Sequence, residues 1–137
     1  MNRLVIGCVL AVSLLIVPAA PAGADPPTQM GPFQETFDDV NPCTGLTNAV
    51  TITTTFYVHS HNDQTVARGD RALSTSSGFV GEGTSSFVVN DEIEMFRSTD
   101  ILSSNSGDRI RASSVFVLDL SSGTARVDRF ELTCLGS

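Results

Sequence analysis

Two histidines and an aspartate alternate near the middle of the chain, at His59, His61 and Asp63. Alternate residues of an extended strand project to one side, so this spacing could gather the three side chains. Imidazole and carboxylate groups bind zinc or copper, which makes these residues the candidate metal ligands. In the alternative interpretation, His59 and His61 complete a polar strand face and Asp63 opens a turn. The absence of a following glutamate at cupin-type spacing favours that alternative, and we predict no cofactor.

The other chemically capable side chains form weaker patterns. The sequence contains no Gly-x-Ser-x-Gly elbow and no glycine-rich phosphate loop, so we assign no catalytic residue. The acids at 91–94 lack the ligand rhythm of a calcium loop. Arg68-Gly69-Asp70 spells an integrin-type tripeptide, but it falls within a predicted strand, where we expect Arg68 and Asp70 to form an exposed polar row. Tryptophan is absent and Tyr57 is the only tyrosine, which argues against a sugar-binding aromatic platform.

The first 24 residues have the layout of a cleaved secretory signal. Arg3 provides the positive start, residues 4–17 are mostly apolar, and a small-residue pattern ends at Ala24, where we place the cleavage. The apolar part is too short for a comfortable membrane span. We therefore expect an extracellular protein with a signal peptide over 1–24, a disordered leader over 25–32 and a single β domain over 33–137.

The predicted export determines which cysteines the mature protein keeps. Cys8 leaves with the signal, so Cys43 and Cys134 are the two thiols that remain. A pair of cysteines in an oxidising compartment predicts a disulfide, here one that closes nearly the whole domain. The alternative of two free or zinc-binding thiols lacks the close Cys-x-x-Cys spacing of zinc sites.

The charge balance limits the classes of partner. The chain has 15 acidic against 8 basic side chains, all arginine, and one of these arginines lies in the predicted signal. Nucleic acids and anionic membranes bind proteins through clusters of cations, which this composition does not supply. We predict neither as a partner once the signal is removed.

Strand spacing dominates the rest of the chain. Runs rich in Thr, Val, Ile and Phe alternate with Gly, Asn, Asp and Ser, and no apolar stripe of helical period is present. The glycine-dense tract 78–83 suggests a bulge or a bend where the sheet curls. The predicted strands are 33–38, 49–60, 65–75, 79–89, 92–102, 109–120 and 124–134.

Short connections leave no room for crossover helices, so the strands should form an antiparallel up-and-down meander. In such a meander, the loop after the first strand and the end of the seventh lie at one end of the molecule. Those are the positions of Cys43 and Cys134, which agrees with the predicted disulfide. We expect an all-β fold in which the sheet curls into a β-barrel, because closure removes exposed edges, with a β-sandwich as the second choice.

The segment Asn41-Pro42-Cys43-Thr44-Gly45 resembles a group of small exported actinobacterial proteins. Their mature domains open with this pentapeptide and end with a cysteine near the C-terminus, as Cys134 does here. Leu46 departs from the glutamate that usually follows. The resemblance covers the layout of the mature chain, implies a β domain with paired cysteines and brings no activity.

These observations favour a non-enzymatic extracellular binding or interaction domain, holding a small apolar ligand inside the barrel. The alternatives are a small metal-dependent enzyme or hydrolase built on His59 and His61, and a structural protein of the cell envelope.

Overall fold

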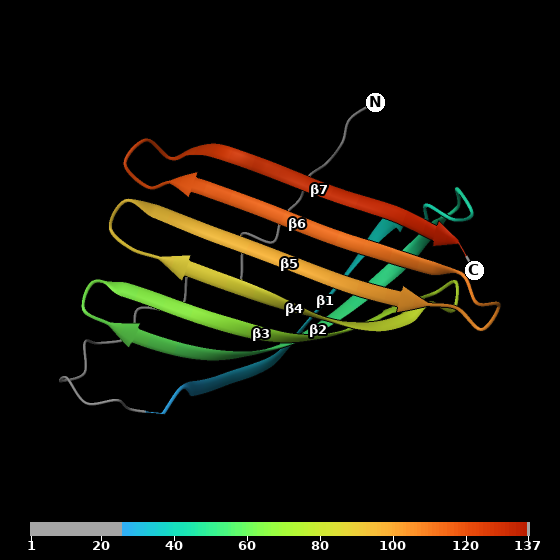
Figure 1. The fold of residues 1–137 in the computed structure, drawn as a ribbon, viewed down its shortest axis with the longest axis horizontal. Coiled ribbons are helices and arrows are strands. Elements are labelled where there is room, and N and C mark those ends of the chain that lie inside the picture. The colour runs from blue at the N-terminus through green and yellow to red at the C-terminus, as the bar shows by residue number, and fades with distance from the viewer. Residues whose placement is uncertain (1–25, 137) are drawn as a thin grey trace.

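The computed structural model describes residues 26–136, which form a single antiparallel sheet. Each strand pairs with the next along the chain, in the order β1 to β7 (Figure 1). The predicted signal segment and its cleavage at Ala24 lie outside the described residues. The strands are β1 (Thr28–Val40), β2 (Thr47–His61), β3 (Gln64–Thr75), β4 (Val80–Val89), β5 (Ile93–Ser103), β6 (Arg109–Asp119) and β7 (Thr124–Gly136).

The predicted seven-strand meander is confirmed, because every predicted strand overlaps the observed one and all six pairings are antiparallel. The Asn, Asp and Ser residues between the strands form the turns. Asn90 Oδ1 accepts hydrogen bonds from the backbone N–H groups of Glu92 and Ile93, both at 2.9 Å. Asp119 Oδ1 accepts in the same way from Ser121, at 2.9 Å, and its pKa is lowered by the bonds from Ser121 and Arg126. Short polar side chains thus fix the turns locally.

The disordered leader predicted over 25–32 is wrong from Thr28 onward, where β1 begins. Pro32 argued against a strand because proline cannot donate to a ladder. Here β1 is an edge strand and its register with β2 shifts between Met30 and Phe33, so Pro32 lies within the irregularity. Gly31 has a φ of 100°, a backbone conformation that is unfavourable for residues with a side chain. An edge bulge therefore accommodates the proline, as sheets permit.

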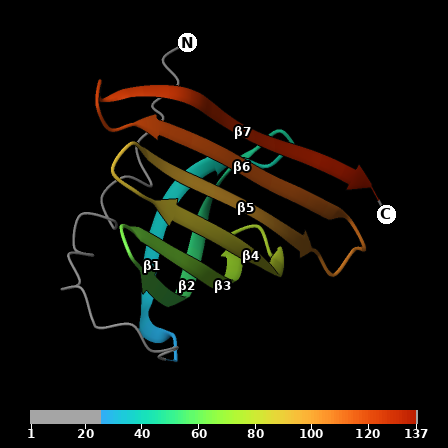
Figure 2. The same cartoon turned by 60° about the vertical axis from the view of Figure 1, so that its left-hand side comes forward.

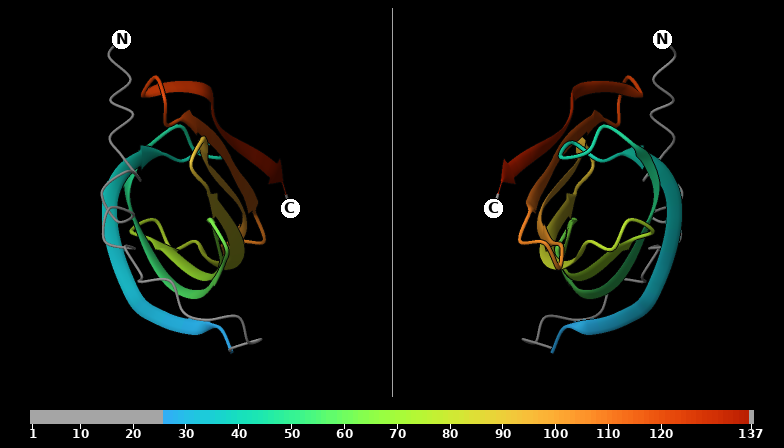
Figure 3. Two further views of the ribbon diagram at one scale, coloured as in Figure 1. Left: turned by 90° about the vertical axis from the view of Figure 1, so that its left-hand side faces the viewer. Right: turned by 90° about the vertical axis from the view of Figure 1, so that its right-hand side faces the viewer.

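The sheet curls but does not close into a barrel, which corrects the first choice made from sequence. β1 and β2 pass behind β4 to β7 (Figure 1 and Figure 2), and the end-on views show a trough (Figure 3). β1 and β7 are the two edge strands and do not pair with each other, and we call the opening between them the seam of the trough. Two other features hinder the edges from pairing with another sheet. β1 carries a bulge, and β7 carries the charged residues Arg126, Asp128, Arg129 and Glu131.

The glycines at 78–83 mark a bend and not a bulge. The register of β4 is continuous with both neighbours from Val80 onward. A Cβ at Gly81 would lie 2.0 Å from the carbonyl oxygen of Ile101 on the adjacent strand. Such a close approach requires a sheet that is strongly curved at this point, and only glycine permits it.

The concave face of the sheet, the inward side of the trough, carries two apolar clusters. One consists of Ile52, Leu73, Phe79, Leu102 and Ile110, and the other of Val58, Ala67 and Phe87. Buried and less buried residues alternate along parts of β2 and β6, as expected of strands with one face toward the interior. In residues 26–136, no helix is long and apolar enough to cross a membrane.

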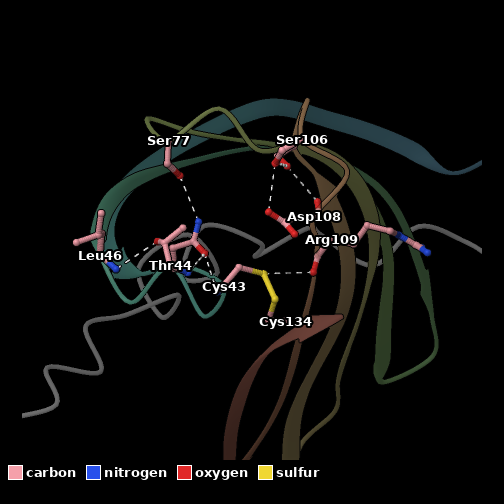
Figure 4. The surroundings of a disulfide bond; sticks show 10 residues. Cys43, Thr44, Leu46, Ser77, Ser106, Asp108, Arg109 and Cys134 are labelled. Atoms are coloured by element: carbon pink, nitrogen blue, oxygen red, sulfur yellow. Dashed lines mark hydrogen bonds between the residues drawn. A yellow bond between two sulfur atoms is a disulfide. The ribbon is translucent and has the colours of Figure 1, made fainter. Parts of the chain in front are cut away.

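The predicted disulfide joins Cys43, in the loop between β1 and β2, to Cys134 of β7 (Figure 4). Asn41, which is 2% exposed, organises this loop. Its Oδ1 accepts hydrogen bonds from the N–H groups of Cys43 and Thr44, at 2.8 and 3.3 Å, and its carbonyl accepts from Gly45 at 2.8 Å. The pentapeptide is therefore an asparagine-capped turn that presents Cys43 to the last strand.

We expect removal of the disulfide by Cys43→Ser/Cys134→Ser to lower the free energy of unfolding by about 4–5 kcal/mol, the chain-entropy estimate for a sequence separation of 91. Denaturant midpoints of the oxidised and double-variant proteins measure the loss. Reductant should shift the wild type toward the variant and leave the variant unchanged. Coincident midpoints would contradict a stabilising bridge.

Candidate ligand-binding site

The candidate metal ligands lie on the convex face, the outer side of the trough, and at a turn. His59 and His61 belong to β2 at positions that alternate with the buried residues, and both side chains are exposed. Asp63 lies beyond the end of the strand, in the turn with Asn62, whose φ is 51°. The strand periodicity that would align the three side chains therefore stops after His61. Of the three predicted ligands, only His59 and His61 project from the same side of the strand.

No group of three or more His, Cys, Asp or Glu side chains in residues 26–136 is placed to hold a metal ion. Asn90, which directly follows β4, lies next to the turn between β2 and β3 and could in principle add an oxygen ligand. However, its Oδ1 atom already accepts two hydrogen bonds within its own turn. The geometry favours the alternative made from sequence, in which the histidines complete a polar strand face.

Arg68 and Asp70 form the exposed polar row that the sequence predicted. Both lie within β3, with side chains 71% and 52% exposed, and Arg68 Nη2 is 3.4 Å from Asp70 Oδ1. The tripeptide is thus part of a strand on the convex face and not of a loop. With Tyr57 and His59, these side chains border an open depression of about 430 Å³.

A buried ion pair on the concave face was not predicted from sequence. Arg71 Nε donates to Asp100 Oδ1 at 2.9 Å, and the side chains are only 7% and 3% exposed. Arg71 lies on β3, Asp100 on β5, and Gly83 of the intervening β4 is the register partner of both. A Cβ at Gly83 would lie 1.9 Å from Asp100 Oδ1. The glycine therefore vacates the space in which the arginine and the aspartate meet.

Burial raises the pKa of the Asp100 carboxyl, and the charge and hydrogen bond of Arg71 only partly offset that effect. Removing two charges from water is expensive, so such a pair is stable only when its geometry is good. Arg71 donates to Asp100 through its Nε. Its two Nη atoms are not fully enclosed, because Ser85 Oγ is the one buried side-chain atom without a hydrogen-bond partner in residues 26–136. The pair is neutral as a whole but retains unused hydrogen-bond donors.

Buried hydroxyl side chains lie beside the ion pair on the concave face. Ser85 and Ser98 are buried on β4 and β5, and Thr54 is buried on β2. The Oγ of Ser85 has no hydrogen-bond partner within residues 26–136. Gly69, opposite Ser85 in the ladder, leaves room for this hydroxyl, since a Cβ there would lie 2.2 Å from it. A band of polar side chains thus separates the two apolar clusters.

A cavity of about 90 Å³ lies between this polar band and the seam. Arg71, Ser98 and Asp100 supply polar groups to its lining. Both edge strands border it, with Phe37 of β1 36% exposed and Phe130 of β7 55% exposed. The apolar walls include Val50, Ile52, Leu102, Ile110, Ala112 and Leu132. This combination of apolar walls with a few convergent polar groups is typical of small-ligand sites.

The sequence carried a signal for this site that strand alternation could have revealed. Arg71 and Asp100 have the same parity as the apolar residues Leu73 and Leu102, two positions further along their strands. A charged residue at an inward position of a strand is unusual, because burial of an unpaired charge is costly. Which charges face each other depends on the register of β3, β4 and β5.

No protein family, no curated protein and no solved structure matches this chain. The likeness of residues 41–45 to exported actinobacterial proteins stays a prediction.

We expect the histidines to make no metal site. Calorimetric titration of zinc or copper into the wild type and into His59→Ala/His61→Ala should give equal heats, because residues 26–136 place no third ligand beside the two imidazoles. Saturable binding that the double variant loses would contradict this expectation.

For the ion pair, we expect Arg71→Met to lower the free energy of unfolding by about 3–5 kcal/mol, because it leaves the Asp100 carboxylate buried without its partner. The second change Asp100→Leu, which keeps the branched shape without charge, should restore most of the loss. Arg68→Met is the matched control, since Arg68 is exposed on the same strand and should change stability by less than about 1 kcal/mol. Equal effects of Arg71→Met and Arg68→Met in denaturant unfolding would contradict the buried pair.

Proposed function

We propose that this chain is a secreted protein that binds a small apolar ligand, without catalysis, in the interior of its curled sheet. The cavity beside the seam carries the proposal. Its walls are largely apolar, and exposed aromatic rings stand at the border through Phe37 and Phe130. Exposed large apolar side chains that gather at one opening are a feature of binding sites more than of a closed core.

The open seam supports entry of a ligand from solvent. A closed barrel would require a ligand to enter through the ends of the strands, whereas β1 and β7 stand apart here. Phe33, also on the inward side of β1, packs against Phe56 with ring centroids 6.2 Å apart. Aromatic side chains thus line the β1 side of the opening from Phe33 to Phe37.

The disulfide supports export, because such bonds persist in oxidising compartments. The acidic composition supports a role without nucleic acid or an anionic membrane as partner. We also propose kinship with the exported actinobacterial proteins that share the pentapeptide at Asn41–Gly45.

The test uses N-phenyl-1-naphthylamine, a neutral probe that becomes fluorescent in apolar surroundings. We expect saturable binding to the oxidised protein that a chelator does not change. Ala112→Leu should weaken it at least about tenfold, because Ala112 lines the cavity and each added methylene occupies ligand space. Ala72→Leu makes the same substitution at an exposed position of β3 and should leave the affinity unchanged.

Probe binding that survives Ala112→Leu would place the probe outside the cavity and overturn the proposal. Binding abolished by a chelator would instead support the metal-dependent alternative.

A further inference from the structure

The cavity contains hydrogen-bond donors that the fold does not use. The Arg71 side chain is more than nine-tenths buried, yet only its Nε donates to an acceptor in residues 26–136. Both Nη atoms belong to a residue that lines the cavity. These Nη atoms are not among the buried unpartnered atoms of residues 26–136, so they can reach the cavity. A ligand oxygen there would accept from a charged donor, and hydrogen bonds to charged groups are stronger than those between neutral groups.

The charges around these donors decide which acceptor fits. Arg71 is the only cationic side chain in the described lining of the cavity, and its charge is matched by Asp100. Asp39, on β1, also lines the cavity. A carboxylate or phosphate ligand would enter a site whose single cation is already paired and whose other charged groups are acidic, so repulsion would oppose it. A carbonyl, ester or hydroxyl oxygen would accept the N–H groups without adding charge.

The size and shape of the cavity restrict the ligand further. A volume of about 90 Å³ is more than one water molecule needs and well below the volume of pockets for drug-sized molecules. It takes the end of a slender molecule. The rest of such a molecule would lie along the seam, against the exposed rings of Phe37 and Phe130.

We infer that the ligand is an uncharged amphiphile, a slender hydrocarbon chain with one carbonyl, ester or hydroxyl oxygen that Arg71 binds through its Nη donors, and that Asp100 and Asp39 make the cavity select against anionic lipids. This inference rests on the proposed function, because it assigns the ligand class of the same cavity. Arg71 is the residue that determines specificity, and Asp100 sets its orientation and neutralises its charge.

The experiment measures displacement of N-phenyl-1-naphthylamine at pH 7.5 by ligands of equal chain length, below their micelle concentrations. Methyl dodecanoate offers a neutral acceptor, and dodecanoate offers a charged one. We expect the ester to displace the probe at a concentration at least about tenfold lower than the anion. In Arg71→Met/Asp100→Leu the cavity keeps its apolar walls, so the probe should still bind, while the ester should bind about tenfold more weakly than to the wild type.

A control variant and the possible outcomes of the experiment distinguish this inference from the proposed function. Arg68→Met should leave all affinities unchanged, because Arg68 faces solvent. Failure of the probe to bind, or indifference to Ala112→Leu, defeats the proposed function itself. Probe binding in the cavity together with equal affinities for ester and anion, or an ester affinity that the double variant leaves unchanged, overturns the ligand class alone.

Discussion

The bond between Cys43 and Cys134 is the constraint on which the shape of this molecule depends. A seven-strand sheet whose first and last strands do not pair could open or flatten, because nothing in its ladder fixes the distance between its edges. The disulfide ties β7 to the turn that follows β1, and it thereby holds the two sides of the trough near each other at one end. The asparagine-capped turn at Asn41 gives Cys43 a fixed position, so the covalent link acts on a rigid element.

The curvature of the sheet has a second cause in its glycines. Gly81 and Gly83 lie on the concave face, where a Cβ would collide with Ile101 or Asp100. Their absence of side chains lets the sheet bend and also makes room for a polar group, which is why a charged pair can lie between two apolar clusters. The same residues thus determine shape and chemistry. Substitutions that fill this space would affect both.

The open seam relates the architecture to the proposed role. Natural sheets usually protect their edges, and here a bulge protects β1 while alternating charges protect β7. With edge pairing blocked in this way, the interior can remain accessible without inviting aggregation. The apolar rings at the border and the polar band behind them give the interior two distinct environments. These would suit the hydrocarbon chain and the oxygen atom of the ligand that we propose.

Sequence by itself determined the local features of this protein. Alternation in β2 and β6, turn residues such as Asn90, and the count of cysteines were sufficient for the strands, the meander and the disulfide, because each depends on neighbouring residues or on parity. Tertiary structure alone decided the open seam, the start of β1 at Thr28 and the separation of Asp63 from His59 and His61. It also decided the pairing of Arg71 with Asp100 across Gly83, since that contact requires three strands in one register and a curvature that no single segment encodes.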